Sequence, residues 1–153
     1  MMPADPSPMP PAADPAPAAA HSAYVLSSAP INLEVQPFLS PSLGAQLQFL
    51  GVVRGLEEGR PISGIAYSAY EPMARSELQQ ILNQGATDLP AHAVFIEHRL
   101  GFVPAGQPSL RILCSSAHSA AAFEACRWYL SRIKASVPIW KAQQFIEPEA
   151  PQA

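Results

Sequence analysis

The sequence predicts an α+β fold with a mainly antiparallel sheet and two principal helices. Three observations lead to this prediction. The chain has 153 residues, which is enough for one domain but not comfortably for two. Apolar residues make up 48% and charged residues 14%, so a core can form and global disorder is excluded. Strand-like and helix-like patterns follow in the order β-β-α-β-β-α-β, and hairpin connections dominate.

The first strands are predicted from residue alternation. Residues 23–26 form a short opening strand. Residues 44–53 (GAQLQFLGVV) place small and apolar side chains on one face and form the next strand. Residues 62–70 (ISGIAYSAY) alternate and are rich in β-forming residues. The polar loop LEEGRP lies between these last two strands, and we expect them to pair across it as a hairpin.

The two helices are predicted from apolar stripes and proline positions. Pro72 suits the first turn of the first helix, which ends near residues 85–88. The stripe of this helix consists of Leu78, Ile81 and Leu82. The second helix spans residues 119–135 and stops where Pro138 pushes Val137 out of the α region. The stripe of the second helix consists of Phe123, Cys126, Tyr129, Leu130 and Ile133.

Three further extended segments complete the predicted sheet. Residues 93–98 (AVFIEH) and 109–115 (SLRILCS) are predicted strands. Residues 100–108 contain two glycines and two prolines and are predicted to form the loop between them. Residues 139–146 continue as an extended segment after the second helix.

Both ends of the chain are predicted to be tails around one domain of residues 23–146. Residues 1–20 contain seven Pro and seven Ala, a composition that gives neither a sheet ladder nor large apolar groups to bury. Residues 1–22 are therefore predicted to be disordered, and residues 147–153 to be a flexible tail. The N-terminal segment lacks the basic and apolar regions of a secretory signal, so we expect a cytoplasmic protein. Cys114 and Cys126 are then expected to be reduced, buried thiols.

Positive charge is scarce and concentrated near the C-terminal end. The net charge of −3 and the pI of about 5.7 argue against a general nucleic-acid binder. No apolar run is long enough to span a membrane. None of the nine Lys and Arg residues precedes Arg54, and residues 125–146 contain four bases but no acid. This distribution predicts a local anion site, and the alternative is a solvated basic helix face.

Lys134 and Lys141 are the only lysines of the chain and lie on either side of Pro138. One hypothesis places them in a cationic pocket, where neighbouring positive charge favours the neutral, nucleophilic form of the Lys134 amine. The alternative is that Lys134 only caps the C-terminal end of the helix, where a positive charge is favourable. The spacing by itself leaves both interpretations open.

Two other segments are candidate anion sites. Residues 115–119 (SSAHS) join a strand to a helix, and free N–H groups at a helix N-terminus attract anions. We expect Ser119 to be the N-cap, with His118 beside it. Arg54 ends a strand and is a candidate anion clamp. The alternatives are an ordinary capped helix and a surface arginine.

Other residues point to no further chemistry. His92 and His98 lie six residues apart on one predicted strand, with no cysteine or carboxylate cluster beside them, so a structural role is predicted rather than a metal site. The sequence has no glycine-rich phosphate loop, no G-x-S-x-G motif and no Cys–His signature.

Five short motifs, in the same order, resemble the large, catalytic subunit of molybdopterin synthase. They are GVVR at residues 51–54, AYEPMA at 69–74, EHRLG at 97–101, SSAH at 115–118 and KASVPIWK at 134–141. The last motif is specific, whereas the others gain weight from their common order. The resemblance covers residues 24–146, which is nearly all of the predicted domain.

The resemblance implies a hammerhead-like α+β fold and a homodimer in which each protomer takes one small ubiquitin-like sulfur-carrier subunit, giving a heterotetramer. The thiocarboxylated Gly-Gly tail of that subunit would enter a pocket and deliver two sulfurs to cyclic pyranopterin monophosphate, giving molybdopterin. Lys134 is implied as the catalytic residue, and Arg54, His118 and Lys141 as substrate-binding residues. Because the partner carries the sulfur, the resemblance implies no cofactor or metal in this chain. It also implies neither a nucleic acid nor a membrane as partner.

Two positions depart from the family's usual pattern. Ser119 stands where arginine is usual, and Gln143 where an acidic residue is usual. The chain also ends about a dozen residues after Lys141, where relatives generally continue. These departures keep a second hypothesis open, a non-catalytic relative that dimerises and docks the small subunit without turnover. The retained Lys134 and Lys141 favour the enzyme. An unrelated α+β domain would require all five motifs to be coincidental.

Overall fold

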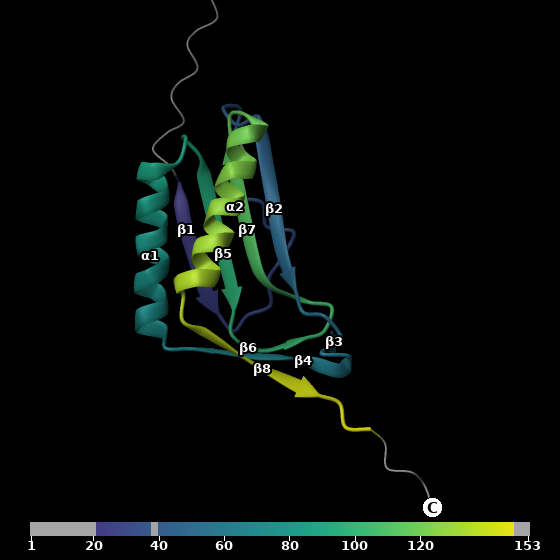
Figure 1. Cartoon of the computed structure of the whole chain (residues 1–153). Coiled ribbons are helices and arrows are strands. Elements are labelled where there is room, and N and C mark those ends of the chain that lie inside the picture. Colours follow the sequence, from purple (N-terminus) through teal and green to yellow (C-terminus); the bar gives the residue numbers. More distant parts are fainter. Residues whose placement is uncertain (1–20, 38–39, 149–153) are drawn as a thin grey trace, which may run out of the picture.

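The described part of the chain forms two sheets and two helices. The computed structural model describes residues 21–37 and 40–148, and Figure 1 shows the elements in order. The first sheet has the strand order β1-β5-β7-β2. Its strands are β1 (Ser22–Ser27), β5 (Ala93–Arg99), β7 (Pro108–Ser116) and β2 (Ala45–Val52). β1 runs parallel to β5, whereas the β5–β7 and β7–β2 pairs are antiparallel.

The second sheet is built around β4 (Arg60–Ala69). Three strands pair with it, all antiparallel: β3 (Leu56–Glu57), β6 (Gly101–Pro104) and β8 (Ile139–Phe145). This sheet lies across one end of the first sheet (Figure 1). The predicted α+β class with a mainly antiparallel sheet and two principal helices is confirmed. The strand after the second helix belongs to the second sheet, so the end of that helix lies beside both sheets.

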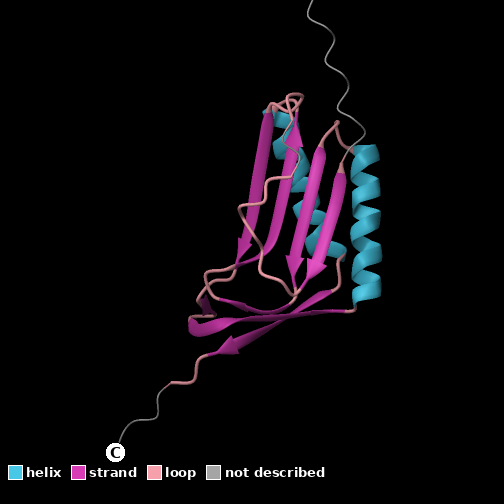
Figure 2. Ribbon diagram, turned by 180° about the vertical axis from the view of Figure 1, so that it is seen from behind, coloured by secondary structure: helices cyan, strands magenta, loops and turns pink. Residues whose placement is uncertain are grey.

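Two helices cover the same face of the first sheet (Figures 1 and 2). They are α1 (Glu71–Asp88), which has Pro72 in its first turn as predicted, and α2 (Ser119–Ser136). The core between helices and sheet includes the predicted stripe of α1 and, from α2, Ala125, Cys126, Tyr129 and Ile133. Phe123 does not follow the prediction, because it is 62% exposed. The small Ala122 and Ala125 are buried instead and let α2 lie close to the sheet.

The predicted hairpin between the second and third extended segments is wrong. β2 pairs with β7, with Phe49 opposite Ile112, and β4 lies in the other sheet. The loop expected between them contains its own small hairpin, β3–β4, whose two turn residues Glu58 and Gly59 both have positive φ. A two-residue turn of this kind matches the twist of tightly paired strands. It therefore reverses the chain locally and leaves β2 free to pair with β7.

One strand was missed where glycine and proline predicted a loop. β6 lies within residues 100–108, and its Val103 is fully buried opposite Ile65 of β4. Burial of Val103 requires partners for the adjacent backbone groups, and pairing with β4 supplies them. A smaller correction concerns α2, whose N-cap is His118 rather than Ser119 and has no side-chain capping hydrogen bond.

The boundaries of the predicted domain lie close to the limits of the described residues. β1 begins at Ser22, the last residue of the predicted N-terminal tail, whereas residues 1–20 and 149–153 lie outside the described part. Cys114 and Cys126 are both free and buried, which confirms their predicted burial. Within residues 21–37 and 40–148, neither helix is long and apolar enough to cross a membrane.

Candidate functional site

A cavity of about 420 Å³ lies where the C-terminal end of α2 meets both sheets. Its polar lining residues are Tyr67, His98, Ser109, Lys134 and Lys141. The rest of the wall is mainly apolar and includes Phe49, Leu110, Ile133, Val137 and Ile139. The two lysines of the chain therefore share one cavity, as the cationic-pocket hypothesis requires.

The end of α2 brings the two lysines together. Lys134 lies in the last turn of α2, and Val137 caps the helix in an extended conformation, with its N–H donating to the Ile133 carbonyl. The chain then turns at Pro138 into β8, where Lys141 lies opposite Tyr67 of β4. Helix termination at proline therefore places residues seven positions apart at the same cavity.

Neither lysine has its charge compensated by a neighbour. Both are exposed, and within residues 21–37 and 40–148 no carboxylate forms an ion pair with either of them. In the same part of the chain, no hydrogen bond joins the Lys134 ammonium to the last carbonyls of α2. Two uncompensated positive charges beside an apolar wall favour binding of an anion that also carries apolar surface.

His98 lines the same cavity, which the sequence did not predict. Its ring packs edge-on against Tyr67, with centroids 5.2 Å apart, and its Nδ1 lies 2.9 Å from the Arg99 carbonyl oxygen. The pKa of His98 is lowered from 6.5 to about 4, chiefly by burial, with a smaller lowering by the positive charge of Lys141 and an opposing effect of the Arg99 hydrogen bond. The imidazole is therefore neutral at pH 7, and the carbonyl assigns its proton to Nδ1.

The sequence predicts a structural role for both His92 and His98, but only His92 lies away from the cavity. His92 precedes β5, and its Nε2 lies 2.6 Å from the Tyr129 hydroxyl inside the core, so its predicted structural role is confirmed. His98 occurs in the EHRLG motif, the one signal that could have identified it. Tyr67 and Ser109 carried no such signal, because both occur in ordinary strand patterns.

Arg54 lies near the cavity but outside its lining. It follows β2 two residues after Val52, which does line the cavity. Its side chain is 79% exposed and forms an ion pair of 3.0 Å with Glu57. An exposed pair of this kind contributes little, so the guanidinium can exchange Glu57 for another anion.

His118 lies at the opposite end of α2 from Lys134. The two residues are separated by sixteen positions of one helix, a length of roughly 24 Å at 1.5 Å per residue. His118 is exposed at the N-cap, next to Ser119. One copy of the chain therefore does not bring His118 to the lysine cavity.

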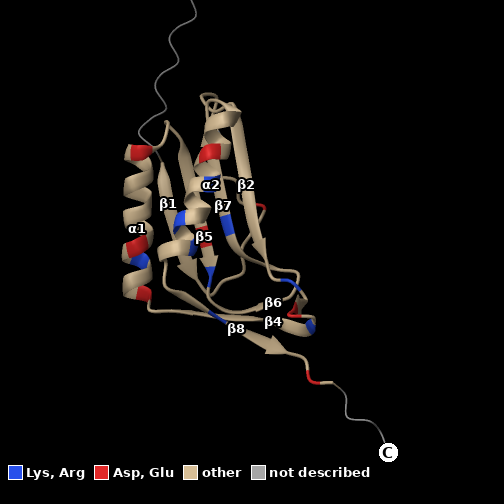
Figure 3. Cartoon of the chain, in the orientation of Figure 1, with Lys and Arg blue, Asp and Glu red and all other residues tan. Residues whose placement is uncertain are grey.

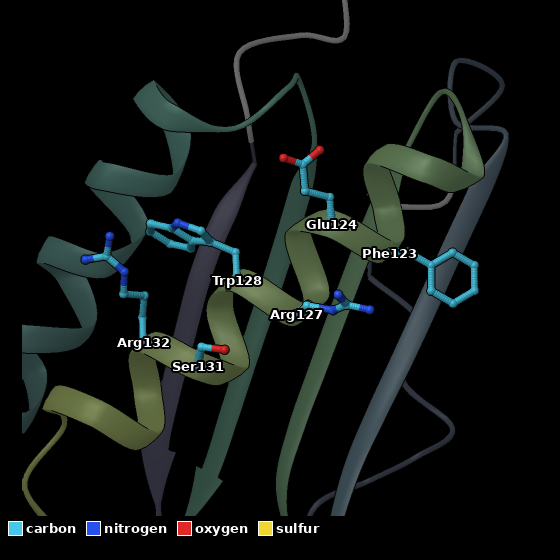
Figure 4. Close-up of a pocket in the computed structure, with 6 residues that line it drawn as sticks. All are labelled: Phe123, Glu124, Arg127, Trp128, Ser131 and Arg132. Carbon is cyan, nitrogen blue, oxygen red and sulfur yellow. The ribbon is translucent and has the colours of Figure 1, made fainter.

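Four of the basic residues lie on α2 and β8, namely Arg127, Arg132, Lys134 and Lys141, and Figure 3 colours the basic positions of the ribbon blue. Part of this charge borders a second hollow, of about 500 Å³, on the outer side of α2 (Figure 4). Its lining consists of Phe123, Glu124, Arg127, Trp128, Ser131 and Arg132. The Arg132 guanidinium lies 4.8 Å from the Trp128 ring and also donates to Gln84, so its charge is already engaged. None of the predicted site residues lines this hollow.

Within residues 21–37 and 40–148, no group of three or more His, Cys, Asp and Glu side chains is placed to hold a metal ion. The chemistry that the cavity offers is that of two ammonium groups, one neutral imidazole and two hydroxyl groups.

Comparisons with known proteins converge on one family. Residues 25–136 match the model of the family described as MoaE protein. The molybdopterin synthase catalytic subunit of Rattus norvegicus is 39% identical over 112 residues, which are 73% of this chain and 56% of the rat protein. The human protein of the same name is 38% identical and is covered to 60%. The chain thus spans a little over half the length of these relatives.

Solved structures agree with this assignment. The crystal structure of molybdopterin synthase from Staphylococcus aureus matches with a TM-score of 0.75 and 30% identity, over 81% of this chain and 92% of that chain. A complex of subunits 1 and 2 of molybdopterin-converting factor from Helicobacter pylori matches with a TM-score of 0.58 over 72% of this chain and 75% of that chain. At 23% identity, this second match shows similarity of fold alone.

Proposed function

The chain belongs to the MoaE protein family, and on this premise we propose that it is the catalytic subunit of a molybdopterin synthase. In this role it converts cyclic pyranopterin monophosphate into molybdopterin, with sulfur from the thiocarboxylated C-terminus of a small ubiquitin-like subunit. The observation that carries the proposal is the cavity that Lys134 and Lys141 share. Relatives that are 38–39% identical and named molybdopterin synthase catalytic subunit support it.

Lys134 is the proposed catalytic residue. At the cavity it meets the acyl end of the partner's tail, where an amine transfers protons during attack and hydrolysis of the acyl group or transiently holds it. No cysteine of this chain is needed, because the sulfur arrives on the partner. The state of Cys114 agrees with this, since its hydrogen bond with Cys126 and its burial raise the pKa of its thiol and so disfavour the nucleophilic thiolate.

Lys141 is the proposed partner of the substrate's phosphate. Its ammonium carries an uncompensated charge beside the cavity, and a phosphate oxygen is a strong acceptor for such a group. The apolar part of the wall suits the flat ring system of a pterin. The cavity volume of about 420 Å³ also lies in the usual range of small-molecule sites.

Arg54 and His118 are the remaining proposed substrate-binding residues. Arg54 needs only to exchange its half-buried partner Glu57 for the substrate. His118 lies at the far end of α2, so it reaches a lysine cavity only if a second copy supplies it. This supports a homodimer with sites completed across the interface. One small subunit for each protomer then gives a heterotetramer.

The cytoplasm is the proposed compartment. Both cysteines are free and buried, which fits a reducing environment. The small sulfur-carrier subunit, a second copy of the chain and cyclic pyranopterin monophosphate are the proposed partners and substrate.

A non-catalytic docking protein is the second candidate, and Ser119 favours it. The residue is exposed at the start of α2, where the family usually provides an arginine. Loss of a guanidinium that contacts phosphate typically costs about 1.5–3 kcal/mol of binding free energy. Such a protein would bind the small subunit and dimerise but leave the substrate unconverted.

Replacement of Lys134 tests the proposal. The purified chain is mixed with thiocarboxylated small subunit and cyclic pyranopterin monophosphate, and molybdopterin is followed by its fluorescent oxidation product. We expect Lys134→Ala to lower product formation by about 10²-fold or more, because proton transfer at the acyl group is lost. Thermal unfolding should be unchanged, because the Lys134 side chain is exposed.

Arg127→Ala is the matched control, since Arg127 is an exposed base on the same helix outside the lysine cavity. It should leave the rate of product formation unchanged. Full activity of Lys134→Ala would contradict the proposed role of this residue. A wild-type chain that binds the small subunit but forms no product would establish the docking protein instead.

A further inference from the structure

The lysine cavity holds a third functional group, the Nε2 atom of His98. The ring is buried and packed against Tyr67, and its Nδ1 is engaged by the Arg99 carbonyl. No hydrogen bond to Nε2 is found from any side chain or backbone group in the described part of the chain. In the same residues, Arg99 Nε is the one side-chain nitrogen or oxygen that is both sealed from solvent and unpartnered. Because His98 Nε2 has no partner and is not among the sealed atoms, it is accessible, and it opens to the cavity that the residue lines.

His98 also differs in kind from the other polar groups of this cavity. Lys134 and Lys141 offer N–H donors, and Tyr67 and Ser109 offer hydroxyl groups that both donate and accept hydrogen bonds. A neutral imidazole with its proton on Nδ1 has a free lone pair on Nε2. His98 is thus the residue of this lining that presents an imidazole lone pair, which can accept a proton.

We propose that His98 is a further catalytic residue, whose Nε2 accepts the proton of the water molecule that releases the partner's tail. This inference rests on the proposed sulfur transfer. Once the thiocarboxylate sulfur has bonded to the substrate, it links the substrate's carbon to the tail's acyl carbon. The water oxygen attacks the acyl carbon and the acyl C–S bond breaks. The sulfur stays on the substrate as a thiolate, and the tail leaves as a carboxylate.

The protons and charges of this step balance without a redox partner. Hydrolysis of the acyl–sulfur bond releases two protons, of which one goes to His98 Nε2 and the other to solvent. The other polar groups that line the cavity with His98 are Tyr67 from β4, Ser109 from β7, Lys134 from α2 and Lys141 from β8. A bound anion offsets the positive charge of Lys141, which is the smallest of the effects on the pKa of His98.

Two substitutions of His98 separate the proposed role of Nε2 as a base from the role of the side chain in packing. His98→Asn places an amide donor near the position of Nδ1 for the Arg99 carbonyl and removes Nε2. His98→Gln places an amide near the position of Nε2 but supplies no base. Each variant is mixed with thiocarboxylated small subunit and cyclic pyranopterin monophosphate in a single turnover. The covalent tail–substrate adduct is followed by mass spectrometry, and thermal unfolding identifies a variant that does not fold.

We expect both variants to form the adduct at the wild-type rate and to hydrolyse it about 10²–10⁴-fold more slowly. Added imidazole should restore part of the hydrolysis in His98→Ala, which a purely structural role would not allow. Lys134→Ala should instead fail before the adduct forms. Wild-type hydrolysis by a folded His98→Asn or His98→Gln would overturn the inference alone. If the wild-type chain forms neither adduct nor product, both the proposed function and this inference are contradicted.

Discussion

Gly85 of α1 and Tyr129 of α2 make a close contact between the two helices. Tyr129 is fully buried, and its hydroxyl donates to His92 Nε2 at 2.6 Å. The other ring nitrogen of His92 donates to the Pro90 carbonyl at 2.7 Å, which fixes the tautomer. Burial raises the pKa of Tyr129, so the hydroxyl keeps its proton. A single side chain thereby joins both helices to the segment that enters β5.

Gly85→Ala is expected to destabilise the protein. Helix propensity alone predicts a gain of up to about 1 kcal/mol for alanine in a helix interior. A Cβ at Gly85, however, would overlap the hydroxyl and ring of Tyr129, and overpacking of this kind typically costs about 1–3 kcal/mol. Urea unfolding should therefore show a lower midpoint. Gly55→Ala is the control, since a Cβ there meets nothing within 4 Å. A higher midpoint for Gly85→Ala would show that the helices separate without cost.

At the scale of the elements, Arg111 of β7 fixes the segment that follows β1. Its guanidinium is completely buried and donates to the carbonyls of Asn32 and Val35 and to Gln48. It also forms an ion pair of 3.4 Å with Glu97 of β5. The segment crosses the face of the first sheet that the helices leave open (Figure 2). One buried cation therefore supplies two hydrogen bonds that hold this segment in place.

Arg111→Met is expected to destabilise the protein by about 3 kcal/mol. Removal of one partner from a buried ion pair leaves the other partner and several carbonyls without donors. The segment around residues 32–35 should also become sensitive to protease before the rest of the chain unfolds. Urea unfolding and limited proteolysis measure the two effects. Arg127→Met, at an exposed position, should change neither. Unchanged proteolysis of Arg111→Met would mean that other contacts hold the segment.

At the scale of the whole molecule, the burial of His98 at the lysine cavity couples its protonation to the stability of the fold. The pKa of His98 is about 4 in the folded protein, below its ordinary value of 6.5, because burial disfavours its charged form. Between these values the unfolded chain binds a proton that the folded chain does not. Stability therefore falls as the pH is lowered from about 6.5 to about 4, and this contribution levels off below that range.

The size of this effect is ~3 kcal/mol at most, from 1.36 kcal/mol for each pKa unit. We expect the free energy of unfolding of the wild-type chain to decrease across this range more steeply than that of His98→Gln. Urea unfolding at several pH values measures both free energies. The contributions of the carboxylates, which the two proteins share, cancel in the difference. Parallel curves would show that His98 titrates in the folded protein as it does in the unfolded chain.

The sequence alone determined the elements with strong periodicity. Both helices, the proline that begins one and the proline that ends the other, and most strands follow from local patterns. The position of Lys134 and Lys141 on either side of a helix end also follows, because termination at Pro138 is a local event. Strand pairing did not follow, since β2 has the same alternation whether it pairs with β4 or with β7.

Tertiary structure alone decided which side chains meet. Phe123 fits the helical period of α2 but lies one position away from the face that packs on the sheet. The strand β6 exists because β4 offers its fully buried Val103 a partner. His98 and Tyr67 become part of the lysine cavity because the second sheet lies across the end of the first. Periodicity assigns a residue to a face, whereas only the packing of elements distant in sequence determines what that face contacts.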